Sequence, residues 1–335
     1  MKVAFFGSKP YEREFFDAEN RRFGHQIVYL EPRLDESTAV LAASFPAVCI
    51  FVHDRADERT LGKLAAGGTR LLALRCAGYN NVDLRAAERA GITVVRVPAY
   101  SPHAVAEHTI ALLLALDRKI HRAYLRVREG NFALDGLMGF DLHGRTAGVV
   151  GTGRIGGIVA RLLRAFGCRV LAYDPIRDPQ CENAGVEYTD LPELLARSEI
   201  VTLHCPLTPE TYHLVDRSAV EAMRPGVFLV NTGRGALVDT RAIIEGLKSG
   251  KIAGVALDVY EEEEGIFYED LSDRIRQDDV LARLLTFPNV IVTAHQAFFT
   301  REAMEAIART TLENIATFAR GEKSGNEVTV EVLRA

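Results

Sequence analysis

The stretch TAGVVGTGRIG at residues 146–156 joins an apolar, β-branched run to three glycines spaced Gly-x-Gly-x-x-Gly. The residues after it carry apolar side chains at intervals of three and four, which predicts a helix. Gly151 allows a tight turn, Gly153 lets the backbone approach a pyrophosphate, and Gly156 allows close helix packing. N–H groups at the helix start attract the anion. In this context the stretch predicts a dinucleotide site, whereas the same glycines outside a strand and helix indicate only a turn.

The next predicted strand, RVLAYD at residues 169–174, ends on a carboxylate. Asp174 lies 18 residues after Gly156, near the interval of about 20 residues at which an acid meets the adenosine ribose hydroxyls. A carboxylate repels a 2′-phosphate, so the sequence favours NAD over NADP, and only Arg177 nearby weakens that preference. The alternative role for Asp174 is a strand-end turn with Pro175. Arg154, with Ile155 beside it, is a further candidate for the cofactor phosphates.

Short apolar runs alternate with helical stretches on both sides of the glycine turn, which predicts an α/β fold with parallel sheets and crossover helices. The runs before the turn lie at residues 3–6, 25–30, 47–52, 71–76 and 93–97, and the later series lies at 146–151, 169–174, 200–206, 227–233, 252–260 and 290–295. A long helical stretch near residues 102–128 separates the two series.

The length of 335 residues exceeds the roughly 250–300 residues at which a single core stops growing, which predicts two domains. A helical pattern at residues 301–322 follows the second series, and we expect it to return to the N-terminal lobe. The expected fold is therefore two Rossmann-like doubly wound parallel-sheet domains with a cleft between them. A substrate domain of residues 1–99, completed by 300–335, accompanies an NAD-binding domain of residues 100–299.

Composition excludes several classes of protein. Forty Lys and Arg residues against 45 Asp and Glu residues leave a net charge of −5, which provides no basic field for nucleic acid or an anionic membrane. The longest apolar run, Ile110 to Leu116, is far shorter than the ~20 residues that span a bilayer. The apolar stretch before Ser8 is too short for the central region of a signal peptide. Five scattered cysteines without a CxxC pair, and His103 and His108 five residues apart, match no metal motif. We expect a cytoplasmic protein with no metal.

Three polar stretches follow strands of the second series: NTGRG at 231–235, DVYEEE at 258–263 and TAHQ at 293–296. Because ligands of an open α/β sheet bind beyond the carboxyl ends of its strands, these stretches should converge. They supply a cation, a carboxylate and an imidazole. Arg binds a planar carboxylate with two parallel hydrogen bonds, His exchanges a proton with the substrate oxygen, and an acid orients the His. This set suits the interconversion of a 2-oxo acid and a 2-hydroxy acid.

The chain resembles the D-isomer-specific 2-hydroxyacid dehydrogenases, and among them the fermentative NAD-dependent D-lactate dehydrogenases. The resemblance covers nearly the whole chain and rests on AFFGSKPYE, VPAYSPHAVAEHT, GTGRIG, HCPLT, NTGRG, LDVYEEE and AHQAF, in that order. It implies that Arg234 holds the substrate carboxylate, that His295 is the acid/base and that Glu263 is its partner. It also implies reduction of pyruvate to D-lactate.

The resemblance implies further contacts. The substrate would meet the backbone of Cys76, Ala77 and Gly78, the side chain of Tyr100 at the pocket edge, and the apolar side chains Phe51 and Phe298. The adenine would meet His204, Cys205 or Pro206, and the nicotinamide side would be lined by Thr232 and Asp258. A homodimer built through the NAD domains, or a homotetramer, is expected, with the helical stretch near 102–128 as a contact.

Alternatives remain for both residues and function. Glu263 belongs to a run of four glutamates, so Glu262 or Glu264 is an alternative partner of His295, and by composition alone the run is a solvated surface. Arg234 could instead be a surface turn residue, and His295 an ordinary strand-end histidine. The substrate could be a bulkier 2-oxo acid, glyoxylate or, least favoured, phosphoglycerate. A function of another class is an NAD-sensing scaffold, like the corepressors that share this fold.

Overall fold

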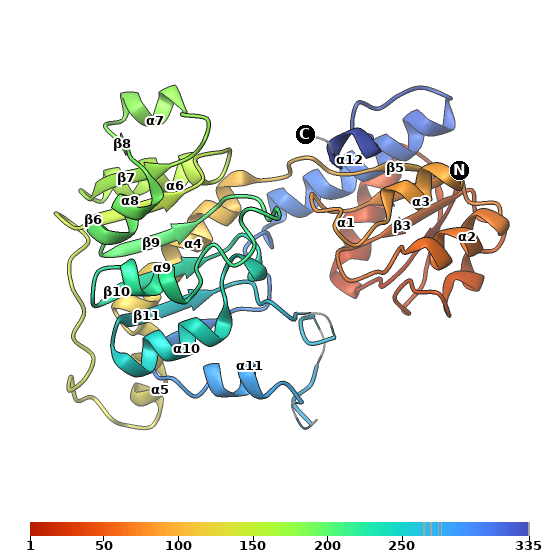
Figure 1. The fold of residues 1–335 in the computed structure, drawn as a ribbon. Coiled ribbons are helices and arrows are strands. Elements are labelled where there is room, and N and C mark those ends of the chain that lie inside the picture. Colours follow the sequence, from red (N-terminus) through yellow and green to blue (C-terminus); the bar gives the residue numbers. More distant parts are fainter. Residues whose placement is uncertain (264, 269, 274, 276, 334–335) are drawn as a thin grey trace. The chain divides into compact units, whose positions relative to one another are not determined.

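The computed structural model describes residues 1–263, 265–268, 270–273, 275 and 277–333. These residues divide into two compact units, which are considered separately. Unit 1 contains residues 1–101 and 299–335, and unit 2 contains residues 102–298. Each unit is built on one parallel sheet (Figure 1). The predicted fold class of two parallel α/β units is confirmed.

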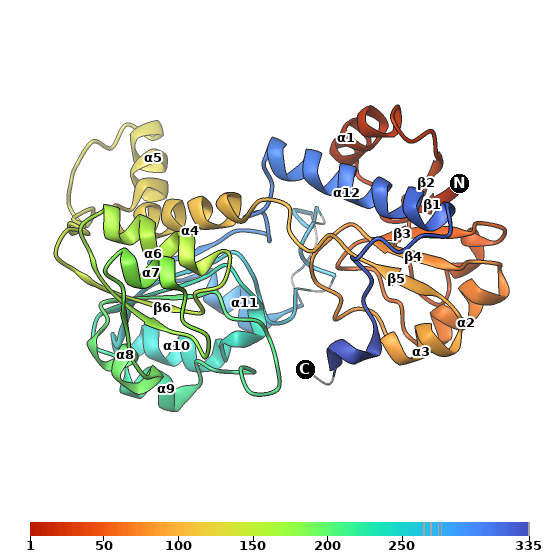
Figure 2. The same cartoon turned by 90° about the horizontal axis from the view of Figure 1, so that it is seen from above.

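Unit 1 has a five-stranded sheet in the order β2-β1-β3-β4-β5, the flavodoxin-like doubly wound order. Its strands are β1 (Lys2–Phe5), β2 (Gln26–Tyr29), β3 (Ala47–Ile50), β4 (Leu71–Leu74) and β5 (Thr93–Val95). Helices α1 (Pro10–Asn20) and α12 (Arg301–Ala319) cover one face, and α2 (Glu58–Ala66) and α3 (Leu84–Arg89) cover the other (Figure 2). Short 3-10 turns lie at Ala39–Ala42 and Val330–Leu333. Strands β3 and β4 are buried along their whole length, as expected for a sheet covered on both faces.

The C-terminal segment completes unit 1. Helix α12 packs against α1 and β4, and the Leu312 carbonyl lies 3.1 Å from Nε2 of His25. Beyond the helix the chain pairs with the edge strand β5, where Val328 N–H donates to Val94 O and Arg96 N–H donates to Asn326 O. The last residues described are therefore tied to the sheet that the first residues begin.

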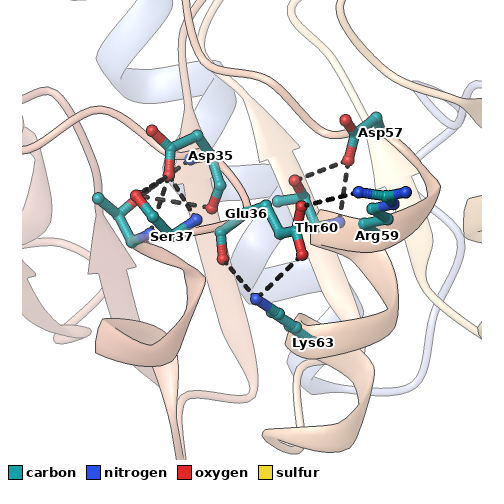
Figure 3. Close-up of polar contacts among 8 residues, drawn as sticks. Asp35, Glu36, Ser37, Asp57, Arg59, Thr60 and Lys63 are labelled. Carbon is teal, nitrogen blue, oxygen red and sulfur yellow. Dashed lines mark hydrogen bonds and ion pairs between the residues drawn. The ribbon is translucent and has the colours of Figure 1, made fainter.

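A surface cluster of polar side chains fastens the loop between β2 and β3 to helix α2 (Figure 3). Asp57 caps α2, because its Oδ1 accepts from Thr60 N–H at 3.0 Å and from Thr60 Oγ1 at 2.8 Å. Glu36 in the loop lies 3.2 Å from Lys63 Nζ and 3.6 Å from Arg59. Such exposed ion pairs contribute little stability, so we assign the cluster to loop placement.

Unit 2 has a seven-stranded sheet in the order β12-β11-β10-β9-β6-β7-β8. Read from β8, this is the Rossmann strand order with one strand added. The strands are β6 (Thr146–Val150), β7 (Arg169–Tyr173), β8 (Glu187–Tyr188), β9 (Ile200–Leu203), β10 (Val227–Asn231), β11 (Ile252–Leu257) and β12 (Val290–Val292). The two-residue strand β8 has no counterpart among the predicted runs, because it is too short to show an apolar pattern.

Helices cover both faces of this sheet, as the view in Figure 2 shows. One face carries α4 (Pro102–Asp117) and α6 (Gly156–Ala165), and the other carries α8 (Leu191–Arg197), α9 (Arg217–Ala222) and α10 (Thr240–Ser249). The remaining helical elements are α5 (Ile120–Arg128), α7 (Pro179–Asn183), a 3-10 turn (Gly235–Leu237) and α11 (Asp279–Leu284).

The long helix expected near residues 102–128 is interrupted. Lys119 adopts a left-handed conformation with φ of 51°, and the chain restarts as α5. Asp117 Oδ1 accepts from Phe140 N–H at 2.8 Å, and a Cβ at Gly139 would lie only 2.8 Å from the Asp117 carbonyl. This tight tertiary contact ends α4 where the apolar pattern alone would continue.

None of the helices in the described ranges combines the length and apolar character that a membrane crossing needs.

Candidate active site

The glycine turn occupies the junction between β6 and α6, and its three glycines are needed for different reasons. Gly151 has φ of +89°, and a Cβ there would lie 2.6 Å from Cys205 N. A Cβ at Gly156 would overlap the Gly151 carbonyl. Gly153, in contrast, has no positive φ, and a Cβ there would meet no atom within 4 Å. Neither strain nor packing within the chain therefore explains glycine at 153.

The open space over Gly153 fits the pyrophosphate of a dinucleotide. Helix α6 starts at Gly156, and its N-cap residue Ile155 forms no side-chain cap hydrogen bond. Gly157 N–H and Ile158 N–H already donate to the carbonyls of Gly153 and Ile155, both at 2.9 Å. The attraction for an anion therefore comes from the positive N-terminal end of the helix, as in other nucleotide sites. Arg154 is exposed beside this space and adds positive charge. The residues present fit the predicted cofactor.

Asp174 follows β7 and is fastened to the glycine turn. Its Oδ2 accepts from Thr152 N–H at 2.7 Å, and its Oδ1 accepts from Ile176 N–H at 2.8 Å. Each carboxylate oxygen keeps a further lone pair for a ribose hydroxyl. The positive charge of Arg177, which could favour a 2′-phosphate, lies 3.6 Å from Glu182. The geometry agrees with a preference for NAD.

The segment His204–Pro206 follows β9, the strand next to β6, so it lies at the same sheet edge as the glycine turn. Thr202 Oγ1 lies 2.9 Å from His204 Nε2. Burial lowers the pKa of His204 and raises the pKa of the Cys205 thiol to about 11. Both side chains are therefore uncharged near neutral pH, which suits the wall of a base-binding pocket.

The turn that carries Arg234 follows β10. Buried Asn231 holds it, because Asn231 Oδ1 accepts from Gly233 N–H at 3.0 Å and Nδ2 donates to Arg234 O at 2.8 Å. The Arg234 guanidinium donates to Gly233 O at 2.8 Å, and no carboxylate in the described ranges forms an ion pair with it. Thr232 Oγ1 lies 2.8 Å from Thr109 Oγ1 on α4. Arg234 is thus a half-buried cation without a protein counter-charge among these residues.

Asp258 follows β11 and is fully buried. Its carboxylate accepts from Thr293 Oγ1 at 2.5 Å and from the N–H groups of Gln296 and Ala297 at 2.9 and 2.8 Å. His108 Nε2 lies 3.5 Å away. Burial favours the neutral acid, but these hydrogen bonds outweigh it and hold the pKa of Asp258 below its usual range. Asp258 therefore anchors the loop that follows β12, while its carboxylate stays ionised.

That loop presents His295. His295 N–H donates to Asp258 O at 2.7 Å, and Tyr268 Oη donates to His295 O at 2.6 Å. The residue has φ of 52°, a left-handed conformation that costs a non-glycine residue free energy. The anchoring through Asp258 and Tyr268 is what holds His295 in that conformation.

The structure brings His295 and Glu263 together. Nδ1 of His295 lies 3.0 Å from Oε1 of Glu263, and the two side chains are 18% and 25% exposed. The carboxylate fixes Nδ1, so Nε2 is the ring nitrogen not engaged by Glu263. Of the other acids in the run, Glu262 is exposed, Glu261 contacts His213, and Glu264 lies outside the described residues.

Strands β10, β11 and β12 are neighbours and parallel, so Arg234, Asp258 and His295 all follow the carboxyl end of the same sheet. The other predicted substrate contacts divide between the units. Phe298 lies buried in unit 2, whereas Phe51, Cys76–Gly78 and Tyr100 belong to unit 1. Phe51 and Cys76–Gly78 follow the adjacent strands β3 and β4, and Phe51 N–H donates to Asp54 at 2.6 Å.

Two residues of α4 have site contacts that the sequence reasoning missed. His108 was weighed only through its spacing from His103 and Thr109 was not singled out, yet the two side chains reach Asp258 and Thr232. The available signal was a polar pair directly before the most apolar run of the chain. Within the described ranges, no group of three or more His, Cys, Asp or Glu side chains could hold a metal ion.

Comparison with known proteins gives consistent matches. The family described as D-isomer specific 2-hydroxyacid dehydrogenase, NAD binding domain, matches residues 110–297. The 2-hydroxyacid dehydrogenase homolog 1 of Schizosaccharomyces pombe is 55% identical over 95% of this chain and 96% of the relative. D-lactate dehydrogenase of Escherichia coli is 49% identical over 98% of this chain and 100% of the relative. The solved structure of the pyruvate reductase of Chlamydomonas reinhardtii has a TM-score of 0.92 and 43% identity, covering 97% of this chain and 98% of that one.

Proposed function

Since the chain belongs to the D-isomer-specific 2-hydroxyacid dehydrogenase family, whose members are NAD-dependent enzymes, we propose that it reduces pyruvate to D-lactate. Membership confirms the predicted reaction class and NAD as cofactor. The proposed residues are Arg234 as carboxylate ligand, His295 as proton donor and Glu263 as partner of His295. The contact of 3.0 Å between His295 and Glu263, beyond the strand edge that also carries Arg234, is the observation that carries these roles.

In the proposed reaction the Arg234 guanidinium binds the carboxylate of the 2-oxo acid and orients C2. When bound, the reduced nicotinamide supplies a hydride. Protonated His295 donates from Nε2 to the carbonyl oxygen as its charge develops, and Glu263 stabilises the imidazolium beforehand. The balance is 2-oxo acid, NADH and one proton giving the 2-hydroxy acid and NAD⁺.

A bulkier 2-oxo acid or glyoxylate is the alternative substrate, and an NAD-sensing scaffold is the alternative of another class. The names of the E. coli and Chlamydomonas relatives support pyruvate. The test is an NADH-oxidation screen of the purified chain over pyruvate, 2-oxobutyrate, phenylpyruvate, 2-oxoisocaproate, glyoxylate and oxaloacetate, with chiral analysis of the product. We expect the highest kcat/KM with pyruvate and a D product. An L product or a clear preference for another acid would contradict the proposal, and a scaffold would bind NADH with very slow turnover.

Turnover tests the role of Glu263. In Glu263→Gln a neutral amide replaces the carboxylate beside Nδ1, so it no longer balances the charge of the protonated imidazole that donates to the substrate. We expect kcat for 2-oxo acid reduction to fall. The measurement is steady-state kinetics, with the exposed neighbour Glu262→Gln as matched control. If the Glu262 variant loses turnover and the Glu263 variant does not, the pairing is wrong.

The proposal includes a homodimer or homotetramer in the cytoplasm. Helix α5 and the following loop expose apolar side chains, including Tyr124 at 59%, Leu125 at 58% and Phe132 at 74%, which is typical of a surface covered by another subunit.

All five cysteines are free thiols, which agrees with the reducing environment of the proposed cytoplasmic location.

Light scattering of the protein as it elutes from a size-exclusion column tests the proposed oligomeric state. We expect a dimer or tetramer for the wild type and a smaller species for Leu125→Glu, because the charge would be buried in the contact. Val40→Glu, at an exposed apolar site of unit 1, is the matched control. A monomeric wild type would contradict the assembly, and an unchanged Leu125→Glu oligomer would contradict this surface.

A further inference from the structure

The first acid of the glutamate run, Glu261, has contacts of its own. One oxygen of its carboxylate accepts from Nε2 of His213, and the other accepts from Thr240 Oγ1 at 2.9 Å and Thr240 N–H at 3.2 Å. Side chains of His213 and Glu261 are 27% and 22% exposed, so the pair is largely shielded from water. We refer to His213, Thr240 and Glu261 as the clamp.

The clamp joins three segments that are distant in the sequence. His213 lies between β9 and α9, Thr240 opens α10, and Glu261 lies between Asp258 and Glu263. His213 and Glu261 lie outside the helices and strands, whereas Thr240 is the first residue of α10. The clamp therefore joins two irregular segments to a helix N-terminus through side chains, in addition to the backbone hydrogen bonds between the same parts of the chain.

The clamp directly adjoins the turn that carries Arg234. His213 N–H donates to Ala236 O at 2.8 Å, two residues beyond Arg234, and Val215 N–H donates to Leu237 O at 3.0 Å. A Cβ at Gly235 would overlap the carbonyl of Tyr260, the residue before Glu261. The Arg234 turn is thus packed against the backbone that leads into the glutamate run.

The same backbone leads to the His295 partner. Glu263 follows Glu261 by two residues, and its Oε2 accepts from Tyr260 N–H at 3.4 Å while its Oε1 contacts His295. His213 and His295 both adopt left-handed conformations, with φ of 51° and 52°, and each contacts a different acid of this run. A left-handed histidine persists only where its surroundings hold it.

We infer that Glu261, through His213 and Thr240, is a positioning residue that sets the distance between the Arg234 guanidinium and the Glu263–His295 pair. It does not touch the substrate. Its role rests on the proposed function, because it assumes that Arg234 and His295 bind and protonate one substrate molecule. A misplacement of about 1 Å between such groups can cost about 10²-fold in rate.

The test is the kinetics of Glu261→Ala with the best 2-oxo acid of the screen. We expect KM for that acid to rise at least ~10-fold and kcat to fall, because both binding and the attack geometry depend on the placement of Arg234. NADH affinity, measured by fluorescence, should stay within about twofold, because the glycine turn follows a different strand. Glu262→Ala, in the next residue, is the matched control. His213→Ala should reproduce the effect and His213→Gln, which keeps a donor, should restore part of it.

A double-mutant cycle with Arg234→Lys distinguishes positioning from a general structural role. If Glu261 acts through Arg234, Glu261→Ala should cost less in the Arg234→Lys background than in the wild type. Additive effects of Glu261→Ala and Arg234→Lys would overturn the inference. So would a fall in kcat with unchanged KM in Glu261→Ala, because that result indicates only a loss of active enzyme. Should Arg234→Lys leave KM unchanged, the proposed carboxylate role fails as well. If Arg234→Lys raises KM and neither Glu261→Ala nor His213→Ala does, only the clamp fails.

Discussion

His295→Ala is expected to lower kcat for 2-oxo acid reduction by about 10²–10⁴-fold, the usual contribution of a positioned general acid. An imidazole can deliver a proton to the substrate oxygen, and Nδ1 of His295 already lies 3.0 Å from Glu263. The loop should keep its shape in the variant, because the backbone N–H and carbonyl of residue 295 make its contacts with Asp258 and Tyr268.

Steady-state kinetics with saturating NADH measures this loss, and NADH fluorescence checks that the cofactor still binds. His143→Ala is a matched control, since His143 is exposed just before β6, at the opposite end of that strand from the glycine turn. Turnover of His295→Ala within about tenfold of the wild type would contradict general acid catalysis by this residue.

Arg234→Ala is expected to lower kcat/KM by about 10²-fold, chiefly through a higher KM for the 2-oxo acid, because a charged pair of hydrogen bonds to the carboxylate is lost. The turn itself should persist, since Asn231 holds its backbone rather than the guanidinium. Arg234→Lys keeps the charge but not the planar fork, so its KM should lie between those of Arg234→Ala and the wild type.

Substrate dependence of the initial rate measures this effect, with Arg241→Ala on the exposed side of α10 as control. A variant of Arg234 with unchanged KM would contradict carboxylate binding. A fall in kcat alone would instead indicate that the guanidinium acts only on the transition state.

Local patterns predicted the features of this chain that depend on near neighbours. The buried strands β3, β4, β6 and β10 coincide in position with continuous apolar runs, and the glycine turn joins a strand to a helix as its spacing indicated. Helix length was harder to predict. The pattern near residues 102–128 continues through Lys119, but the contact of Asp117 with Phe140, 23 residues later, ends α4.

Contacts between distant segments could not be predicted from local patterns either. His108 and Thr109 read as a polar step before an apolar helix, and nothing in their spacing connects them with Asp258 or Thr232. These contacts join residues more than a hundred positions apart, so they arise only when α4 packs across the sheet.

The run of four glutamates shows most clearly what the sequence determined and what the tertiary structure determined. The sequence by itself determined the strand edge, the glycine turn and the presence of a cation, an acid and an imidazole, because periodicity and spacing are local properties. Within the run the resemblance implied Glu263 as the partner of His295, and Glu262 and Glu264 remained alternatives. Only the tertiary structure decided that Glu261 contacts His213 and Thr240 while Glu263 contacts His295. The direction of a side chain in an irregular segment is set by through-space partners, and those partners are contributed by other parts of the fold.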